Sequence, residues 1–223
     1  MDEQTTTGLD VAASLRANLY FALARALEPP RVWREDLPGL LTEAFGRMAS
    51  PFPELGGRLS AHFSDLLEDR DQVAVAHAKL FLGPFEILAA PWASFYLEED
   101  PRLMGPTSQY AAMAYADAGL APSEKLKDAP DLVTHELEFM YFLAFSEATT
   151  GDEEWYDRQK RFWQEHLGNW LPRFAHAVAK EEIHPFYDTL AEALAAACSL
   201  EEEELGPTPG VSKRGSEEPG AQP

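Results

Sequence analysis

The sequence has few basic residues for its acidic content. Lys and Arg together number 18 against 38 Asp and Glu, so the formal charge is 18 − 38 = −20. Nucleic-acid binding through a basic surface is therefore not expected, because contacts to phosphate depend on clustered Lys and Arg. An anionic membrane surface would repel the chain for the same reason. A basic partner, such as an Arg-rich peptide, would instead be attracted to it.

Cysteine and long apolar runs are also scarce. Cys198 is the single cysteine, which excludes intrachain disulfides and cysteine-based metal clusters. It lies in the run AEALAAAC, where we expect a small buried side chain. No window holds 18 consecutive apolar residues, and the first ten residues carry acids where a secretory signal has bases. We therefore expect a cytoplasmic protein without stable membrane insertion.

The motifs of common catalytic and phosphate-binding sites are missing. No glycine-rich phosphate loop and no G-x-S-x-G elbow is present. His135-Glu136 begins like a zinc-protease helix, but Phe139 occupies the position of the second histidine. Glu136 and Glu138 would lie on different faces of a helix, which makes them a poor acid–base pair. We expect no catalytic residue, no metal site and no cofactor.

Apolar residues recur at helical spacing along most of the chain. Leu15, Leu19, Leu23 and Leu27 fall on one face of a helix that Pro29-Pro30 would end. Further helices are expected over about 37–48, 55–67, 71–83, 107–118, 131–150, 152–167, 169–180 and 185–204, with a short one at 85–89. No run of alternating β-branched residues predicts a strand. The predicted fold class is all-α, a single compact helical domain of about eight to ten helices.

The last 19 residues have a different composition. Residues 205–223 hold four Gly, four Pro and no aromatic residue, so we expect a helical domain over 1–204 and a disordered Gly/Pro-rich tail over 205–223. The charges of the tail cancel, which leaves the whole −20 on residues 1–204. Residues 130–204 carry 17 acids and 5 bases, a net −12. The EEEE run at 201–204 is expected to fray, since acids oppose the dipole at a helix C-terminus.

An aromatic, proline-rich connection interrupts the helices. Residues 84–106 contain four prolines among Trp92, Phe95 and Tyr96. Loops of this length without repeating structure are often functional. Aromatic side chains on a stiff loop can hold an apolar or Arg-bearing segment through burial and cation–π contact. The alternative is that the three aromatics only pack the loop onto the core.

Three local patterns occur in order along the chain. The first is Leu80-Phe81-x-Gly83-Pro84, followed by Pro91-x-x-Ser94-x-Tyr96. The second is Pro130-Asp131 at a helix start that continues Glu136-Leu137-Glu138-Phe139-Met140. The third is His166-Leu167-x-x-Trp170-x-Pro172-x-Phe174, followed by Phe186-Tyr187. Together they resemble the TorD/DmsD family of redox-enzyme (molybdoenzyme) maturation chaperones, which is related to the NarJ type, over roughly residues 10–200.

The resemblance implies a cytoplasmic all-α chaperone that is not an enzyme. Members of that family bind the twin-arginine signal peptide and the apo form of a molybdoenzyme, assist cofactor insertion and delay export. They occur as monomers or helix-swapped dimers, and the stretch 119–131 would permit such an exchange. The implied peptide-binding residues are Tyr20, Trp92, Ser94, Tyr96, Pro130 and Asp131, to which the aromatic loop adds Phe95.

The chain departs from the family directly after Asp131. Leu132 stands where the family has histidine, so an apolar side chain replaces a titratable one. Asp131 itself is expected to cap the helix that follows. A cap carboxylate with one open face can also meet a guanidinium.

Two other function classes stay open at this point. One is a helical interaction scaffold that acts through the acidic C-terminal third, unrelated to signal peptides. The other is a metal-dependent hydrolase that uses carboxylates and histidines. Bound metal in the purified protein would favour the hydrolase, and recovery of a molybdoenzyme subunit from a pull-down would disfavour the scaffold.

Overall fold

The computed structural model describes residues 10–68, 70–83, 86–100, 102, 104–121 and 128–208. Within these ranges the chain is helical and its only β-type pairing is one isolated bridge. The predicted all-α single-domain fold is therefore confirmed. Residues 209–223, most of the predicted tail, lie outside the described residues, as do residues 122–127 of the predicted hinge.

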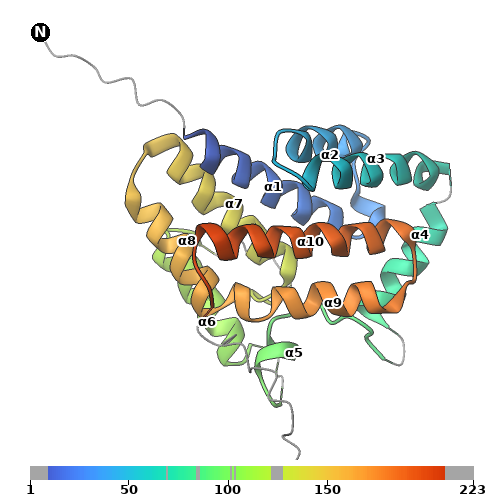
Figure 1. The fold of residues 1–223 in the computed structure, drawn as a ribbon. Helices are drawn as coiled ribbons and strands as arrows, with labels where there is room; N and C mark the ends of the chain where they lie inside the picture. The colour runs from blue at the N-terminus through green and yellow to red at the C-terminus, as the bar shows by residue number, and fades with distance from the viewer. Residues whose placement is uncertain are drawn as a thin grey trace, which may run out of the picture.

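Ten α-helices and three short helical turns follow one another along the described chain (Figure 1). They are α1 (Val11–Leu27), η1 (Pro30–Val32), α2 (Leu37–Gly46), α3 (Phe52–Glu68), α4 (Arg70–His77), η2 (Ala78–Leu82), α5 (Ser94–Leu97), α6 (Pro106–Asp117), α7 (Val133–Thr150), α8 (Glu153–Glu165), η3 (Leu167–Asn169), α9 (Leu171–Glu181) and α10 (Pro185–Glu204).

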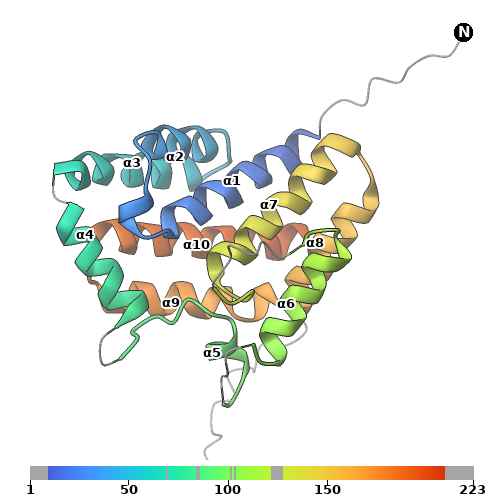
Figure 2. The ribbon, with the colours of Figure 1, turned by 180° about the vertical axis from the view of Figure 1, so that it is seen from behind.

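The pair formed by α1 and α7 lies at the centre of the fold. These two helices make the most extensive contact in the molecule, and both views show them side by side (Figures 1 and 2). The α2–α3 hairpin packs beside α1, α8 packs on α7, and α9 pairs with α10. The last residue of α1 and the first turn of α7 line one cavity together with the loop that precedes α5.

Most helix ends lie where the sequence predicts them. α1 ends at Leu27, ahead of Pro29, because proline cannot donate a helical hydrogen bond. α7 ends at Gly151, whose φ of 67° is a conformation that glycine adopts without strain. α10 begins with Pro185 at its first position. Cys198 on α10 is buried, as expected.

The proline-rich connection differs from the prediction. Residues 86–89 are not helical, whereas Ser94–Leu97 form the short helix α5. The sequence also suggested Asp71 as the N-cap of the fourth helix, but that helix begins at Arg70 and Asp71 lies in its first turn. That helix ends in the wide turn η2 and stops at Gly83, where φ is 33° and a Cβ would overlap the backbone carbonyl of Glu86.

The C-terminal end of α10 also differs from the prediction. The helix continues to Glu204. Glu201 is 2% exposed and forms an ion pair with Arg16. The expected fraying of 201–204 is therefore wrong, because a buried partner outweighs the unfavourable dipole. Leu205 is buried, its carbonyl accepts a hydrogen bond from Gln164 at 2.8 Å, and the chain packs as far as Thr208. The packed body thus extends four residues past the predicted boundary.

Candidate functional site

The aromatic loop and the start of α7, which the sequence singles out separately, are joined by backbone hydrogen bonds. The N–H of Val133 donates to the Pro91 carbonyl at 2.8 Å, and the N–H of Ala93 donates to the Asp131 carbonyl at 3.0 Å. These bonds flank an antiparallel bridge between Trp92 and Leu132. The positions of Trp92 and of the first turn of α7 are therefore fixed relative to each other.

The carboxylate of Asp131 strengthens this junction. Its Oδ2 accepts from the backbone N–H of Ser94 at 3.0 Å, and its Oδ1 accepts from the Ser108 hydroxyl at 2.6 Å. The side chain therefore binds the N-terminal end of α5 and the first turn of α6. The N-cap of α7 is Leu132, which makes no side-chain cap bond, so the predicted capping of α7 by Asp131 is wrong. Asp131 is 0% exposed, which leaves no open face for a guanidinium.

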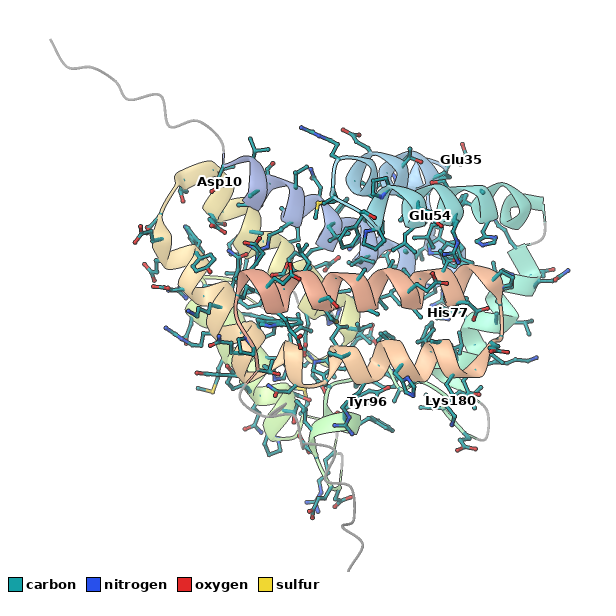
Figure 3. The ribbon with its side chains drawn as sticks, in the orientation of Figure 1. Asp10, Glu35, Glu54, His77, Tyr96 and Lys180 are labelled. Atoms are coloured by element: carbon teal, nitrogen blue, oxygen red, sulfur yellow. The ribbon has the colours of Figure 1, made fainter. Side chains whose placement is uncertain are left out.

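The other predicted site residues have different surroundings. Trp92 is partly exposed and packs on Phe95, which is 49% exposed, with ring centroids 5.9 Å apart. Tyr96, labelled in Figure 3, is partly buried and stacks on the buried Trp170, and burial raises the pKa of its hydroxyl to about 12. The carbonyl of Pro130 accepts from Tyr115 at 2.7 Å.

Tyr20 and Ser94 are both buried. Tyr20 lies beside the Arg16–Glu201 ion pair, with 2% exposure. Ser94 is 6% exposed. Of the seven predicted residues, only Trp92 lines the cavity described next.

A cavity of about 450 Å³ opens beside the Trp92–Leu132 bridge. It lies between the end of α1, the turn η1, the α4–η2 segment and the start of α7. Its apolar wall includes Leu27, Val32, Phe81, Pro91, Trp92 and Leu132. Leu132, which replaces the family histidine, therefore contributes apolar surface to this wall.

The rim of the cavity is acidic. Glu28, Asp128 and Glu138 supply three carboxylates and Arg31 supplies one guanidinium, so the charged lining sums to −3 + 1 = −2. Sequence reasoning did not select these acids. No local pattern in the sequence distinguishes these acids from acids on a solvated helix face.

Two histidines also line the cavity, and both are neutral at neutral pH. Burial lowers the pKa of His135, whose Nδ1 lies 3.1 Å from the carbonyl of Ala129. Burial lowers the pKa of His77 from 6.5 to about 4 (Figure 3). The histidines therefore do not offset the acidic charge of the rim.

The low pKa of His77 predicts a loss of stability in mild acid. His77 gains a proton near pH 6.5 in the unfolded chain and only near pH 4 in the folded chain. The contribution of His77 to the free energy of unfolding is therefore fully present above pH 6.5 and is lost as the pH falls toward 4. Between pH 7 and pH 5 the free energy of unfolding should fall by about 2 kcal/mol more in the wild type than in His77→Gln. Urea titrations at both pH values measure this difference. The control His176→Gln, at an exposed histidine, should lose as much unfolding free energy between the two pH values as the wild type. An equal loss in His77→Gln and the wild type would contradict the prediction.

Residues of the second and third sequence patterns meet in the core. The Glu136 carboxylate is 0% exposed, and its two oxygens lie 2.6 Å from Nε2 of His166 and 2.9 Å from the Trp170 indole nitrogen. Burial raises the pKa of Glu136, and the two partners oppose that rise. The contacts tie α7 to the α8–α9 connection, so these pattern residues have a structural role.

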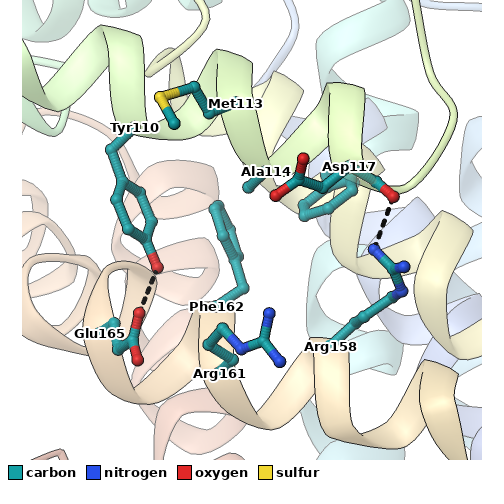
Figure 4. A pocket seen from close by; sticks show the side chains of 9 residues that line it. Tyr110, Met113, Ala114, Asp117, Arg158, Arg161, Phe162 and Glu165 are labelled. Carbon is teal, nitrogen blue, oxygen red and sulfur yellow. Dashed lines mark hydrogen bonds between the residues drawn. The ribbon is translucent and has the colours of Figure 1, made fainter.

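A second cavity lies between α6 and α8 (Figure 4) and has a different character. Its volume is about 140 Å³, close to that of an engineered cavity that holds one benzene ring. Tyr110 donates to Glu165 at 2.9 Å on one side, and Arg158 donates to the Asp117 carbonyl at 2.7 Å on the other. The guanidinium of Arg161 also lines it. Two acids and two arginines line it, so its charged lining sums to −2 + 2 = 0, and its small volume makes it unsuited to an extended peptide.

Features that would indicate other classes of site are missing from the described part of the chain. There, no group of three or more His, Cys, Asp or Glu side chains is placed to hold a metal ion. No helix in the same part is long and apolar enough to cross a membrane. Burial raises the pKa of the Cys198 thiol, so this cysteine lacks the properties of a reactive nucleophile.

Comparison with known proteins gives consistent matches. Residues 46–176 match the family described as the nitrate reductase delta subunit. The chain is 30% identical over 143 residues to chaperone protein TorD of Vibrio parahaemolyticus, covering 60% of this chain and 66% of that protein. It is 29% identical over 138 residues to chaperone protein TorD of Vibrio vulnificus, covering 60% and 64%. The matches thus span slightly less than two thirds of these relatives.

One solved structure shares the fold. It is described as a redox enzyme maturation protein from Archaeoglobus fulgidus, with a TM-score of 0.51 and 22% identity. The alignment covers 81% of this chain and 91% of that one. This likeness supports the single all-α domain.

Proposed function

Because the chain belongs to the nitrate reductase delta subunit family, which includes the redox-enzyme maturation chaperones it resembles, we propose that it is a maturation chaperone for a molybdoenzyme. It binds the twin-arginine signal peptide and the apo form of that enzyme, holds the enzyme during cofactor insertion and delays its export. The named relatives are chaperones and not enzymes, and binding alone accounts for this role.

The cavity beside Trp92 is the observation that carries the proposal. A twin-arginine signal peptide joins two cationic side chains to an apolar segment. The cavity offers the matching surfaces, since an apolar wall with a partly exposed indole adjoins lining residues of net charge −2. Exposed arginine–carboxylate attraction would draw the peptide in, and burial of its apolar segment would retain it.

Calorimetric titration with a synthetic peptide tests the proposal. The peptide carries two adjacent arginines followed by an apolar segment, and a control peptide has both arginines replaced by glutamine. We expect saturable binding that weakens as salt rises from about 0.05 to 0.5 M, because ions screen exposed charges. The control peptide should bind more weakly and with less salt dependence. Absence of binding, or equal binding of the two peptides, would overturn the proposal.

Trp92→Ala should weaken binding of this peptide about tenfold. A partly exposed tryptophan at the wall of a cavity is the kind of residue that dominates interface energies. Phe145→Ala is the matched control, because Phe145 is an aromatic residue with 48% exposure on α7 that does not line the cavity. Equal affinity in Trp92→Ala and the wild type would place the peptide elsewhere.

The scaffold hypothesis predicts a different result with the client enzyme. A scaffold that ignores signal peptides would bind the apoenzyme equally well with and without its signal sequence. The chaperone should lose affinity when that sequence is removed. A titration of both enzyme forms against the full chain separates the two hypotheses.

A further inference from the structure

Arg25, in the last turn of α1, holds two carboxylates with a single guanidinium. Its Nη1 donates to Oε1 of Glu28 at 2.7 Å, and its Nη2 contacts Oε1 of Glu138 on α7. The guanidinium also lies over the ring of Phe21, 5.2 Å from the centroid. Two carboxylates and an aromatic face thus surround the guanidinium, although Nε of Arg25 is buried without a hydrogen-bond partner.

This arrangement lies at the mouth of the cavity beside Trp92. Glu28 and Glu138 both line that cavity. Glu28 also lines an adjoining groove of about 900 Å³, together with Arg25 and Phe21. The two carboxylates therefore face the space into which a peptide would enter, and Arg25 contacts them from the groove side.

We propose that Glu28 and Glu138 form a subsite for a guanidinium of the ligand, and that Arg25 is a resident occupant which the ligand's arginine displaces. This inference rests on the proposed function, because it names how that cavity selects arginine. Displacement conserves the pairing, since one guanidinium leaves the two carboxylates as another takes its place. The strength of the contacts between Arg25 and the two carboxylates thereby sets the affinity that an arginine of the ligand must exceed.

The exposure of the three side chains suits such an exchange. Arg25 and Glu28 are 27% and 26% exposed, and Glu138 is 42% exposed, so water can reach each of them. A fully buried trio would be too costly to separate. Without any guanidinium, the two carboxylates would repel each other beside an apolar wall, which gives the resident arginine a structural purpose.

The arrangement also favours arginine over lysine. A guanidinium has five donors in a planar fork and can bond both carboxylates while its face lies on an aromatic ring. An ammonium group is a compact charge that cannot match the two separated oxygens in one plane. A peptide with both arginines changed to lysine should therefore bind more weakly, although its charge is unchanged.

Peptide affinities of four variants of the full chain test the proposal. Arg25→Gln should bind the twin-arginine peptide about tenfold more tightly, because the carboxylates are then unoccupied. Arg31→Gln removes the same charge from the wall of the same cavity and should give a smaller gain. Glu138→Gln should bind about tenfold more weakly. In the double variant Arg25→Gln/Glu138→Gln the gain should disappear.

Each outcome supports or overturns a defined claim. Wild-type binding without a gain in Arg25→Gln, or a gain no larger than in Arg31→Gln, overturns the displacement and leaves the proposed function intact. Absence of binding in the wild type and in all variants overturns both. Arg25→Lys provides a second route if Arg25→Gln does not fold: it keeps the charge, loses the fork, and should bind more tightly than the wild type.

Discussion

Replacing Glu201 by alanine should lower the free energy of unfolding by about 3–5 kcal/mol, the largest effect that we expect for a single substitution. Glu201 accepts two hydrogen bonds from Arg16, at 3.0 Å from Nε and 2.7 Å from Nη2. Arg16 is 5% exposed, and the next carboxylate, on Glu147, lies 3.9 Å away. The variant would leave a buried guanidinium without its main partner, and this cost exceeds the net benefit of the pair itself.

Two comparisons make this expectation specific. Glu203→Ala removes an exposed acid from the same turn of α10 and should change the unfolding free energy by less than about 0.5 kcal/mol. Arg16→Met/Glu201→Leu replaces the buried pair with apolar side chains and should recover most of the lost stability. Urea titrations at neutral pH provide all the values. A loss below about 1 kcal/mol in Glu201→Ala would show that Arg16 finds another partner or reaches water.

Asp131→Ala should abolish measurable peptide binding and also destabilise the fold by about 2–4 kcal/mol. The substitution removes a buried acceptor and leaves the Ser94 N–H and the Ser108 hydroxyl without partners. The junction that positions Trp92 against Leu132 would then loosen. Binding is lost in this view because the cavity wall moves, with no direct contact between Asp131 and the ligand.

Asp131→Asn distinguishes a positioning role from direct contact. If Asp131 bound the ligand's guanidinium, Asp131→Asn would weaken peptide binding without changing stability. The structure predicts the opposite result for Asp131→Asn. Its urea midpoint should fall, and the protein that stays folded should retain much of its affinity for the peptide. Asp128→Asn, at an exposed acid of the same cavity rim, should leave stability unchanged and weaken binding modestly. Loss of affinity in Asp131→Asn at unchanged stability would favour direct contact.

The position of the candidate site followed only partly from the sequence. The aromatic loop and the start of α7 were both selected as unusual, and the structure joins them. Of the predicted peptide-binding residues, Trp92 lines the cavity, whereas Tyr20 and Asp131 are buried. The residue types and motif positions of Tyr20 and Asp131 suggested a binding role. Whether a side chain is buried depends on which other helices pack over it, and a local motif does not contain that information.

The acids that face the cavity were not identified from the sequence for a related reason. Glu28 and Glu138 are two of 38 acidic residues, and no local pattern distinguishes them from acids on a solvated face. They become a pair only because α1 and α7 pack side by side and Arg25 reaches both. The total charge of −20 indicated that a partner would be positively charged, but it did not indicate where on the surface that partner would bind.

The sequence by itself determined the long helices. Apolar spacing, prolines such as Pro29 and Pro185 and glycines such as Gly151 act within one or two turns, so their effects are readable from neighbouring residues. Only the tertiary structure decided which polar groups meet. Asp131 bonds Ser94 across 37 positions, and Arg16 bonds Glu201 across 185. Such pairings depend on how whole helices pack, and that packing is set by the combined apolar surface of the chain rather than by any local segment.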